Sequence, residues 1–173
     1  GDAGVEGQPG RGSTFWFTVR LKKGEVECET VPPSAAVNAE ESLKRDYAGR
    51  RILLAEDEPV SGEVARMLVE DGGMAVDAAE DGGQAVKLAG ANDYALILMD
   101  MQMPTLDGLE ATRRIRLASG KKRIPILAMT ANAFVEDKAK CFEAGMDDFL
   151  TKPIAPNIFY ATLLRWLKQS GSA

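Results

Sequence analysis

The sequence predicts an α/β fold in which one parallel β-sheet is covered on both faces by helices. From residue 50 onward, five short apolar runs alternate with segments whose apolar residues recur at helical spacing. The runs are almost continuously apolar, as expected of strands buried on both faces, and the segments between them are long enough for right-handed helical crossovers.

The five expected strands follow one another at regular intervals. The first is the run Ile52–Ala55, and a second, weaker one covers Ala75–Ala79. The other three are Tyr94–Met99, which ends at Asp100, then Ile124–Met129 and Asp148–Thr151.

Five helices are expected between and after these strands. The first follows Pro59, where Val60, Val64, Met67 and Leu68 fall at helical spacing, and two glycines end it. The other four are expected at about Gln84–Ala91, around Leu109 and Ile115, up to Gly145, and after Pro153 with Phe159, Leu163 and Leu167.

The residues before this domain differ from it in composition and in apolar pattern. The run Ser13–Leu21 is aromatic and β-branched and predicts one strand, which needs a sheet from elsewhere or a contact with the next domain to be stable. Pro32-Pro33, several glutamates and the lack of an apolar period predict a solvated linker. We therefore expect an N-terminal segment over 1–24, a linker over 25–48 and a domain over 49–170.

The composition excludes several classes of function. The chain has 173 residues, a net charge of −5 and 45% hydrophobic residues, which gives no electrostatic case for nucleic-acid or anionic-membrane binding. It has neither a secretion signal nor an apolar window long enough to span a bilayer, and Cys28 and Cys141 cannot form a disulfide framework. We expect a cytoplasmic setting.

The sequence has no histidine, which rules out histidine-dependent catalysis and imidazole metal sites in this chain. Any chemistry must therefore use carboxylates, hydroxyls and lysine.

Polar side chains stand where four of the expected strands end. Glu56 and Asp57 follow the first strand, Asp100 ends the third, and Thr130 and Lys152 follow the fourth and fifth. Because the carboxyl ends of parallel strands meet at one edge of a sheet, where such folds bind ligands, we expect these five residues to form a site.

The residue types at this edge indicate phosphoryl chemistry. Three carboxylates together are unfavourable unless a cation neutralises them, and hard oxygen ligands without histidine or thiolate favour Mg²⁺. Lys152 and Thr130 would then supply a positive charge and a hydroxyl to the oxygens of a phosphoryl group. Asp100 remains as the nucleophile, forming an acyl phosphate.

Four segments, in the same order along the chain, closely resemble the receiver domains of two-component signalling. The resemblance covers roughly residues 50–170 and implies a flavodoxin-like sheet with the strand order 2-1-3-4-5. The segments are Leu54–Glu58, Leu98–Gly108, Ala128–Ala133 and Asp148–Pro153.

The resemblance assigns a role to each matching position. It makes Asp100 the phosphorylation site, with Asp57 binding Mg²⁺ directly, Glu56 binding it mainly through water, and the backbone carbonyl of Gln102 completing the protein ligands. Thr130 and Lys152 would contact the phosphoryl group.

Two further features follow from the same resemblance. Phe149 occupies the position of a switch aromatic residue that acts together with Thr130; since phenylalanine has no hydroxyl, its switching would depend on packing alone. The Lys152–Pro153 bond is expected to be cis, which only an X-Pro bond adopts at low cost.

A second, shorter resemblance concerns the N-terminus. Residues 4–17 resemble the last glycine-rich segment and closing strand of a histidine-kinase ATP-binding domain. The order of kinase end, linker and receiver implies a hybrid sensor kinase as the parent protein. The resemblance then implies two partners: a phosphohistidine domain of that same parent and a separate histidine phosphotransfer protein.

Other interpretations remain open at this point. Taken singly, Asp100 could be a helix cap, Thr130 an ordinary strand residue and Lys152 a solvated surface residue. An aspartate-nucleophile phosphohydrolase resembling the haloacid dehalogenases would need a second aspartate where Gln102 stands. A docking module on the same fold would usually have lost one of the site residues, and a DNA-binding regulator is disfavoured because no effector domain precedes Ala173.

Overall fold

The computed structural model describes residues 1–8, 12–19, 33–118, 123–131 and 135–170. The chain divides into two compact units, Gly1–Thr30 and Val31–Ala173. The predicted boundary between residues 24 and 25 lies outside the described residues.

The larger unit is the predicted doubly wound α/β domain. Its five strands form one parallel sheet in the order β4-β3-β5-β6-β7, which is the predicted order 2-1-3-4-5. The strands are β3 (Arg51–Ala55), β4 (Ala75–Ala79), β5 (Leu96–Asp100), β6 (Ile126–Thr130) and β7 (Asp148–Thr151). The helices are α1 (Pro33–Asp46), α2 (Pro59–Asp71), α3 (Gly82–Ala91), α4 (Gly108–Ala118), α5 (Val135–Ala144) and α6 (Pro156–Ser170).

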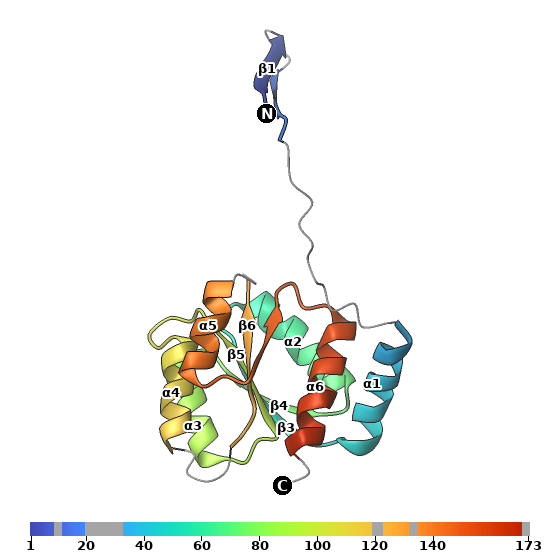
Figure 1. Ribbon diagram of the computed structural model, residues 1–173, viewed down its shortest axis with the longest axis vertical. Helices are drawn as coiled ribbons and strands as arrows, with labels where there is room; N and C mark the ends of the chain where they lie inside the picture. Colours follow the sequence, from blue (N-terminus) through green and yellow to red (C-terminus); the bar gives the residue numbers. More distant parts are fainter. Residues whose placement is uncertain (9–11, 20–32, 119–122, 132–134, 171–173) are drawn as a thin grey trace. The chain divides into compact units, whose positions relative to one another are not determined.

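The helices form a layer on each face of the sheet (Figure 1). One core cluster joins α1, α2 and α6 to the sheet and is centred on Phe159 and Leu163, both 0% exposed. The other joins α3, α4 and α5 to the opposite face, with Ala85, Ala111 and Cys141 buried against it. Every residue of β5 and β6 is buried, because these central strands are covered on both faces.

Helix α1 lies inside the segment predicted to be a solvated linker, so that prediction is wrong for residues 33–46. Ala39 and Leu43, one helical turn apart, are 3% and 0% exposed and pack in the cluster that contains α6. Two buried residues among many polar ones do not form a recognisable apolar period in the sequence. The surface that buries them belongs to α6, so the sequence of α1 by itself does not reveal the helix.

Helix α2 begins at Pro59, directly after the acidic run Glu56–Glu58. The carboxylate of Glu58 caps it by accepting hydrogen bonds from the amides of Val60 at 3.0 Å and Ser61 at 2.6 Å. The apolar residues that marked this helix in the sequence are largely on its outer face: Val60, Val64 and Met67 are 70%, 46% and 54% exposed. Its buried positions are Ala65 and Val69.

The N-terminal unit contains a hairpin instead of the single predicted strand. Strand β1 (Ala3–Gln8) pairs antiparallel with β2 (Gly12–Phe17). The first strand was missed because its glycines are poor strand formers. Gly4 is required there, since a Cβ atom would lie 2.6 Å from the ring of Trp16.

Among the described helices, none has both the length and the apolar character that crossing a bilayer requires.

Candidate functional site

Three carboxylates meet at the carboxyl edge of the sheet. Glu56 and Asp57 follow β3, and Asp100 is the last residue of the neighbouring strand β5. One carboxylate oxygen from each of the three lies within 4.8 Å of the other two. Glu56 and Asp100 are each 7% exposed, whereas Asp57 is exposed. The convergence that we predicted from the strand order is confirmed.

Lys152 completes this cluster from the end of β7. Its Nζ atom donates hydrogen bonds to Asp100 Oδ2 at 2.8 Å and to Glu56 Oε1 at 2.9 Å. Its backbone amide donates to the carbonyl oxygen of Thr130 at 2.8 Å, which fixes the exit of β7 beside β6. The Lys152–Pro153 bond is cis, as predicted.

Burial dominates the electrostatics of the cluster. It raises the pKa of Glu56 to about 7, where the hydrogen bond from Lys152 opposes the shift and the charge of Asp100 adds to it. Burial alone would lower the pKa of the Lys152 ammonium group, but hydrogen bonds to Asp100 and Glu56 raise it above its ordinary value. One lysine is thus shared by two buried carboxylates, with a third carboxylate close by.

The donor set fits a divalent cation. Glu56 Oε2 is buried and lies 2.6 Å from Lys152 Nζ, but it accepts no hydrogen bond. A buried carboxylate oxygen that lacks a hydrogen bond is unfavourable, and a hard cation would satisfy it. The three carboxylates Glu56, Asp57 and Asp100 offer the oxygen ligands that Mg²⁺ prefers. The carbonyl of Gln102 stays a predicted ligand.

The loop after Asp100 is held tightly beneath the cluster. The amide of Gln102 donates to Asp100 Oδ1 at 3.2 Å, and the amide of Gly108 donates to the carbonyl oxygen of Met101 at 3.1 Å. A Cβ atom on Gly108 would overlap the carbonyl oxygen of Asp100, so this glycine lets the loop return under the site. The sequence placed Gly108 in a motif without revealing this close approach.

Thr130 and Phe149 stand on β6 and β7, which pair with each other on one side of β5. Thr130 is 6% exposed at the end of β6, beside Thr151 of β7. Phe149 of β7 is half-buried, and Lys138 Nζ of α5 lies 4.1 Å from the centroid of its ring. The ring therefore has a cation–π contact in addition to the packing that the sequence suggested.

The chain belongs to the response regulator receiver domain family, whose pattern matches residues 52–163. It is 39% identical over 162 residues to histidine kinase 1 of Arabidopsis thaliana, covering 73% of this chain and 13% of that relative. The chain spans about an eighth of the length of this relative.

Solved receiver domains share the fold. One is the receiver domain of sensor histidine kinase PA1611 from Pseudomonas aeruginosa, which has a magnesium ion in its active-site cleft. It is 43% identical to this chain, with a TM-score of 0.66, and the match covers 70% of this chain and 99% of that one. Another is the receiver domain of Ssk1 from Saccharomyces cerevisiae, in complex with the histidine phosphotransfer protein Ypd1. It is 27% identical to this chain, with a TM-score of 0.65, and the match covers 70% of this chain and 91% of that one. The chain is thus a receiver domain of a two-component phosphorelay.

Proposed function

We propose that Asp100 accepts a phosphoryl group from a phosphohistidine, in a reaction that requires Mg²⁺. The observation that carries the proposal is the convergence of three carboxylates and Lys152 at one edge of the sheet, with the ammonium group 2.8 Å from Asp100 Oδ2. A site with a nucleophile, a cation and clustered oxygen ligands suits phosphoryl transfer better than any other chemistry available to this chain.

In the proposed step, a carboxylate oxygen of Asp100 attacks phosphorus. An oxygen–phosphorus bond forms, the phosphorus–nitrogen bond breaks, and its electron pair returns to the imidazole of the donor. Lys152 Nζ, already 2.8 Å from Asp100 Oδ2, can donate to a phosphoryl oxygen attached there. Mg²⁺ held by Asp57, Asp100 and Glu56 would supply further positive charge to the phosphoryl oxygens.

We further propose that the acyl phosphate shifts the domain between two conformations. Thr130 would turn toward the phosphoryl group and Phe149 would pack behind it, so that phosphate stabilises the state in which both point inward. The buried position of Thr130 and the half-buried ring of Phe149, on adjacent strands, support this pairing.

The proposed partner for relay is a histidine phosphotransfer protein. The surface next to the site suits a protein partner, because α2 starts two residues after Asp57 and exposes Val60, Val64 and Met67. Replacing Met67 with glutamate should slow transfer to such a partner while leaving phosphorylation by acetyl phosphate intact; equal slowing of both reactions would contradict this docking surface.

The hairpin supports a parent protein with a kinase domain. Val5 and Phe15 face each other across β1 and β2, and Phe17 lies on the same face. All three are exposed, by 59%, 80% and 78%, which a larger sheet would prevent. We propose that residues 1–24 end a histidine-kinase ATP-binding domain. A longer chain that includes both this domain and a phosphoaccepting histidine should phosphorylate Asp100 from ATP, and residues 1–173, which contain 0 histidines, should not.

Intact mass tests the central proposal. With acetyl phosphate and magnesium, the wild-type chain should gain one phosphoryl group and Asp100→Asn should gain none. Asp107→Asn is the matched control, since Asp107 only caps α4 by accepting from the Glu110 amide at 2.7 Å. Full labelling of Asp100→Asn, or labelling of the wild-type chain by ATP alone, would refute the mechanism.

A further inference from the structure

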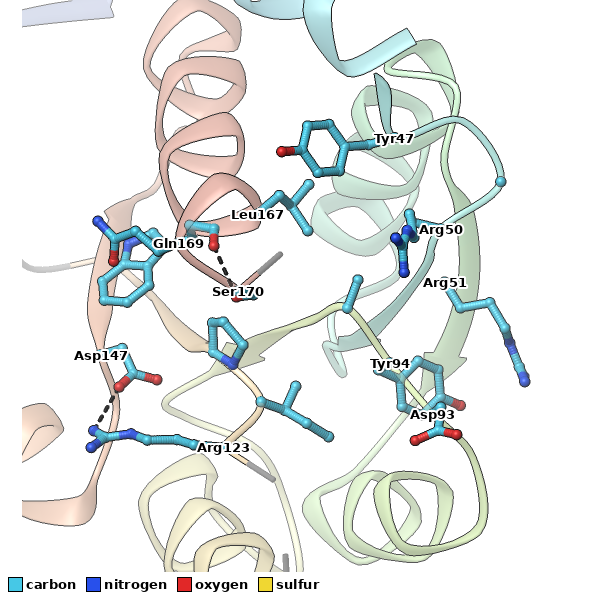
Figure 2. Close-up of a pocket in the computed structure, with 15 residues that line it drawn as sticks. Tyr47, Arg50, Arg51, Asp93, Tyr94, Arg123, Asp147, Leu167, Gln169 and Ser170 are labelled. Carbon is cyan, nitrogen blue, oxygen red and sulfur yellow. Dashed lines mark hydrogen bonds and ion pairs between the residues drawn. The ribbon is translucent and has the colours of Figure 1, made fainter. Parts of the chain in front are cut away.

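A pocket opens at the amino-terminal edge of the sheet, opposite the edge that carries Asp100 (Figure 2). It has a volume of about 680 Å³, within the range of small-molecule sites. Strands β3, β5 and β6 begin at its floor, and the ends of α1 and α6 form part of its wall. The proposed phosphoryl transfer uses none of its residues.

Three aromatic rings line the pocket at different places (Figure 2). Tyr47, Tyr94 and Trp166 line it, from the end of α1, the segment before β5 and helix α6. Two of these rings are fixed by hydrogen bonds: Tyr94 donates to Asp77 at 2.6 Å, and the Trp166 indole donates to Asp148 at 2.8 Å. Tyr94 is only 3% exposed and lies beneath the guanidinium group of Arg51, so the stacking surface open to a ligand comes from the half-buried rings of Tyr47 and Trp166.

The rim carries three arginines, which differ in their partners. Arg51 pairs with Asp77 and lies over the ring of Tyr94, with 5.3 Å between guanidinium and centroid. Arg123 donates to Asp147 at 2.7 Å. Within the described residues, the guanidinium group of Arg50 has neither a hydrogen bond nor an ion pair.

Arg50 and Tyr47 lie on the same side of the pocket (Figure 2). Figure 2 shows Tyr47 and Arg50 on one side of the pocket and Arg123 and Asp147 on the other. The chain as a whole has a net charge of −5, yet the pocket is lined by three arginines and two aspartates. A ligand with one anionic group and a flat apolar body would match both features.

We propose that this pocket binds a nucleoside monophosphate, with its phosphate at Arg50 and its base stacked on Tyr47 or Trp166. Guanidinium groups recognise phosphate through paired hydrogen bonds, and bases stack on aromatic side chains irrespective of their identity. Tyr47 directly follows α1 and Trp166 belongs to α6, so a ligand that contacts both rings would connect the end of α1 to α6. The site is independent of Asp100.

Amide and indole chemical shifts test the proposal on the whole chain. AMP, GMP, CMP and UMP are each titrated in magnesium-free buffer, beside adenosine and inorganic phosphate. At least one monophosphate should shift the amides of Arg50 and Arg51 and the indole of Trp166. Adenosine or phosphate alone should bind about tenfold or more weakly, since each lacks one of the two interactions.

Variants separate this site from the other edge of the sheet. Arg50→Gln should weaken binding about tenfold. Arg50→Lys should retain part of the affinity. The matched control Arg66→Gln, on α2, should bind like wild type, and so should Asp100→Asn. The proposal is refuted if none of the four nucleotides binds at millimolar concentration, if Arg50→Gln binds unchanged, if adenosine or phosphate binds as tightly, or if the shifts centre on Gln102 and Lys152.

Discussion

Single glycines shape the loop that follows Asp100. Gly108 lies under Asp100, where a Cβ atom would overlap the carbonyl oxygen of that residue. Gly82, at the start of α3, is similarly close to the carbonyl oxygen of Leu106 in the same loop. Because backbone at both sites has little room to move in a packed domain, the geometry of the loop depends on the absence of two side chains.

Gly108→Ala should therefore destabilise the domain by about 2 kcal/mol or more and slow phosphorylation of Asp100, since the loop must shift to admit the methyl group. Gly90→Ala is the matched control. Its Cβ atom would meet nothing within 4 Å inside α3, so it should be neutral or stabilising by up to about 1 kcal/mol. Urea unfolding and acetyl phosphate labelling measure both effects, and equal outcomes for the two variants would contradict the steric argument.

Asp147 is a second residue on which local structure depends. Its carboxylate accepts hydrogen bonds from Arg116 at 2.6 Å, from Arg123 at 2.7 Å and from the amide of Ile126 at 2.9 Å. Only 7% of this side chain and 17% of that of Arg116 are exposed. The carboxylate therefore ties α4 to the beginnings of β6 and β7.

Asp147→Asn should lower the free energy of unfolding by about 2–3 kcal/mol, because it leaves the half-buried Arg116 without its anion. Glu110→Gln removes an anion that pairs with two exposed arginines of α4, and it should cost less than about 1 kcal/mol. Chemical denaturation of both variants tests this difference. A larger loss of unfolding free energy in Glu110→Gln than in Asp147→Asn would contradict the argument that the buried ion pair contributes more.

At the scale of elements, α1 extends the domain beyond the strands and helices that the apolar runs predicted. Leu43 is fully buried beside α6, and Gly73, at φ +80°, lets the turn after α2 approach the backbone of Lys44. The amide of Gly49 also donates to the carbonyl oxygen of Gly73 at 2.9 Å. Helix α1 is thus attached to its neighbours by packing, and the turn that follows it by a backbone hydrogen bond.

Leu43→Ala should cost about 2–4 kcal/mol of unfolding free energy if α1 belongs to the cooperative unit. Lys44→Ala, one residue along, removes only an exposed ion pair with Glu40 and should change stability by less than about 0.5 kcal/mol. Thermal melting of both variants is the measurement. Two near-neutral results would show that α1 frays independently of the sheet.

At the scale of the whole molecule, the net charge is −5, and three carboxylates cluster at one edge of the sheet, where two of them share one lysine. A cation that binds only the folded state stabilises it in proportion to the logarithm of its concentration. The folded domain should therefore be more stable with magnesium than without it.

Millimolar magnesium should raise the melting midpoint of the wild-type chain by several degrees, as expected for about 2 kcal/mol in a domain of this size. Asp57→Ala should show little or no rise, because it removes an exposed ligand from the cluster. Sodium chloride at matched ionic strength controls for screening. The same rise in both proteins would argue against a metal site at Asp57.

The sequence alone determined the fold class, the strand order through its resemblance, and the residues that meet at the carboxyl edge. These predictions succeeded because buried parallel strands require continuous apolar runs. The carboxyl ends of such strands meet at one edge of the sheet irrespective of the residues on the protein surface. The same reasoning missed α1 and β1, whose stabilising contacts lie on other elements.

Only the tertiary structure decided which faces are buried and how close the groups lie. The apolar spacing of Val60, Val64 and Met67 predicted the helix but not that this face is largely exposed, since Ala65 and Val69 fill the space against the sheet. The sharing of Lys152 by Asp100 and Glu56, and the position of Arg50 in the pocket at the far edge, likewise depend on distances between segments remote in sequence. Periodicity specifies which residues are apolar or polar along one element, whereas contacts between elements are fixed by packing of the whole domain.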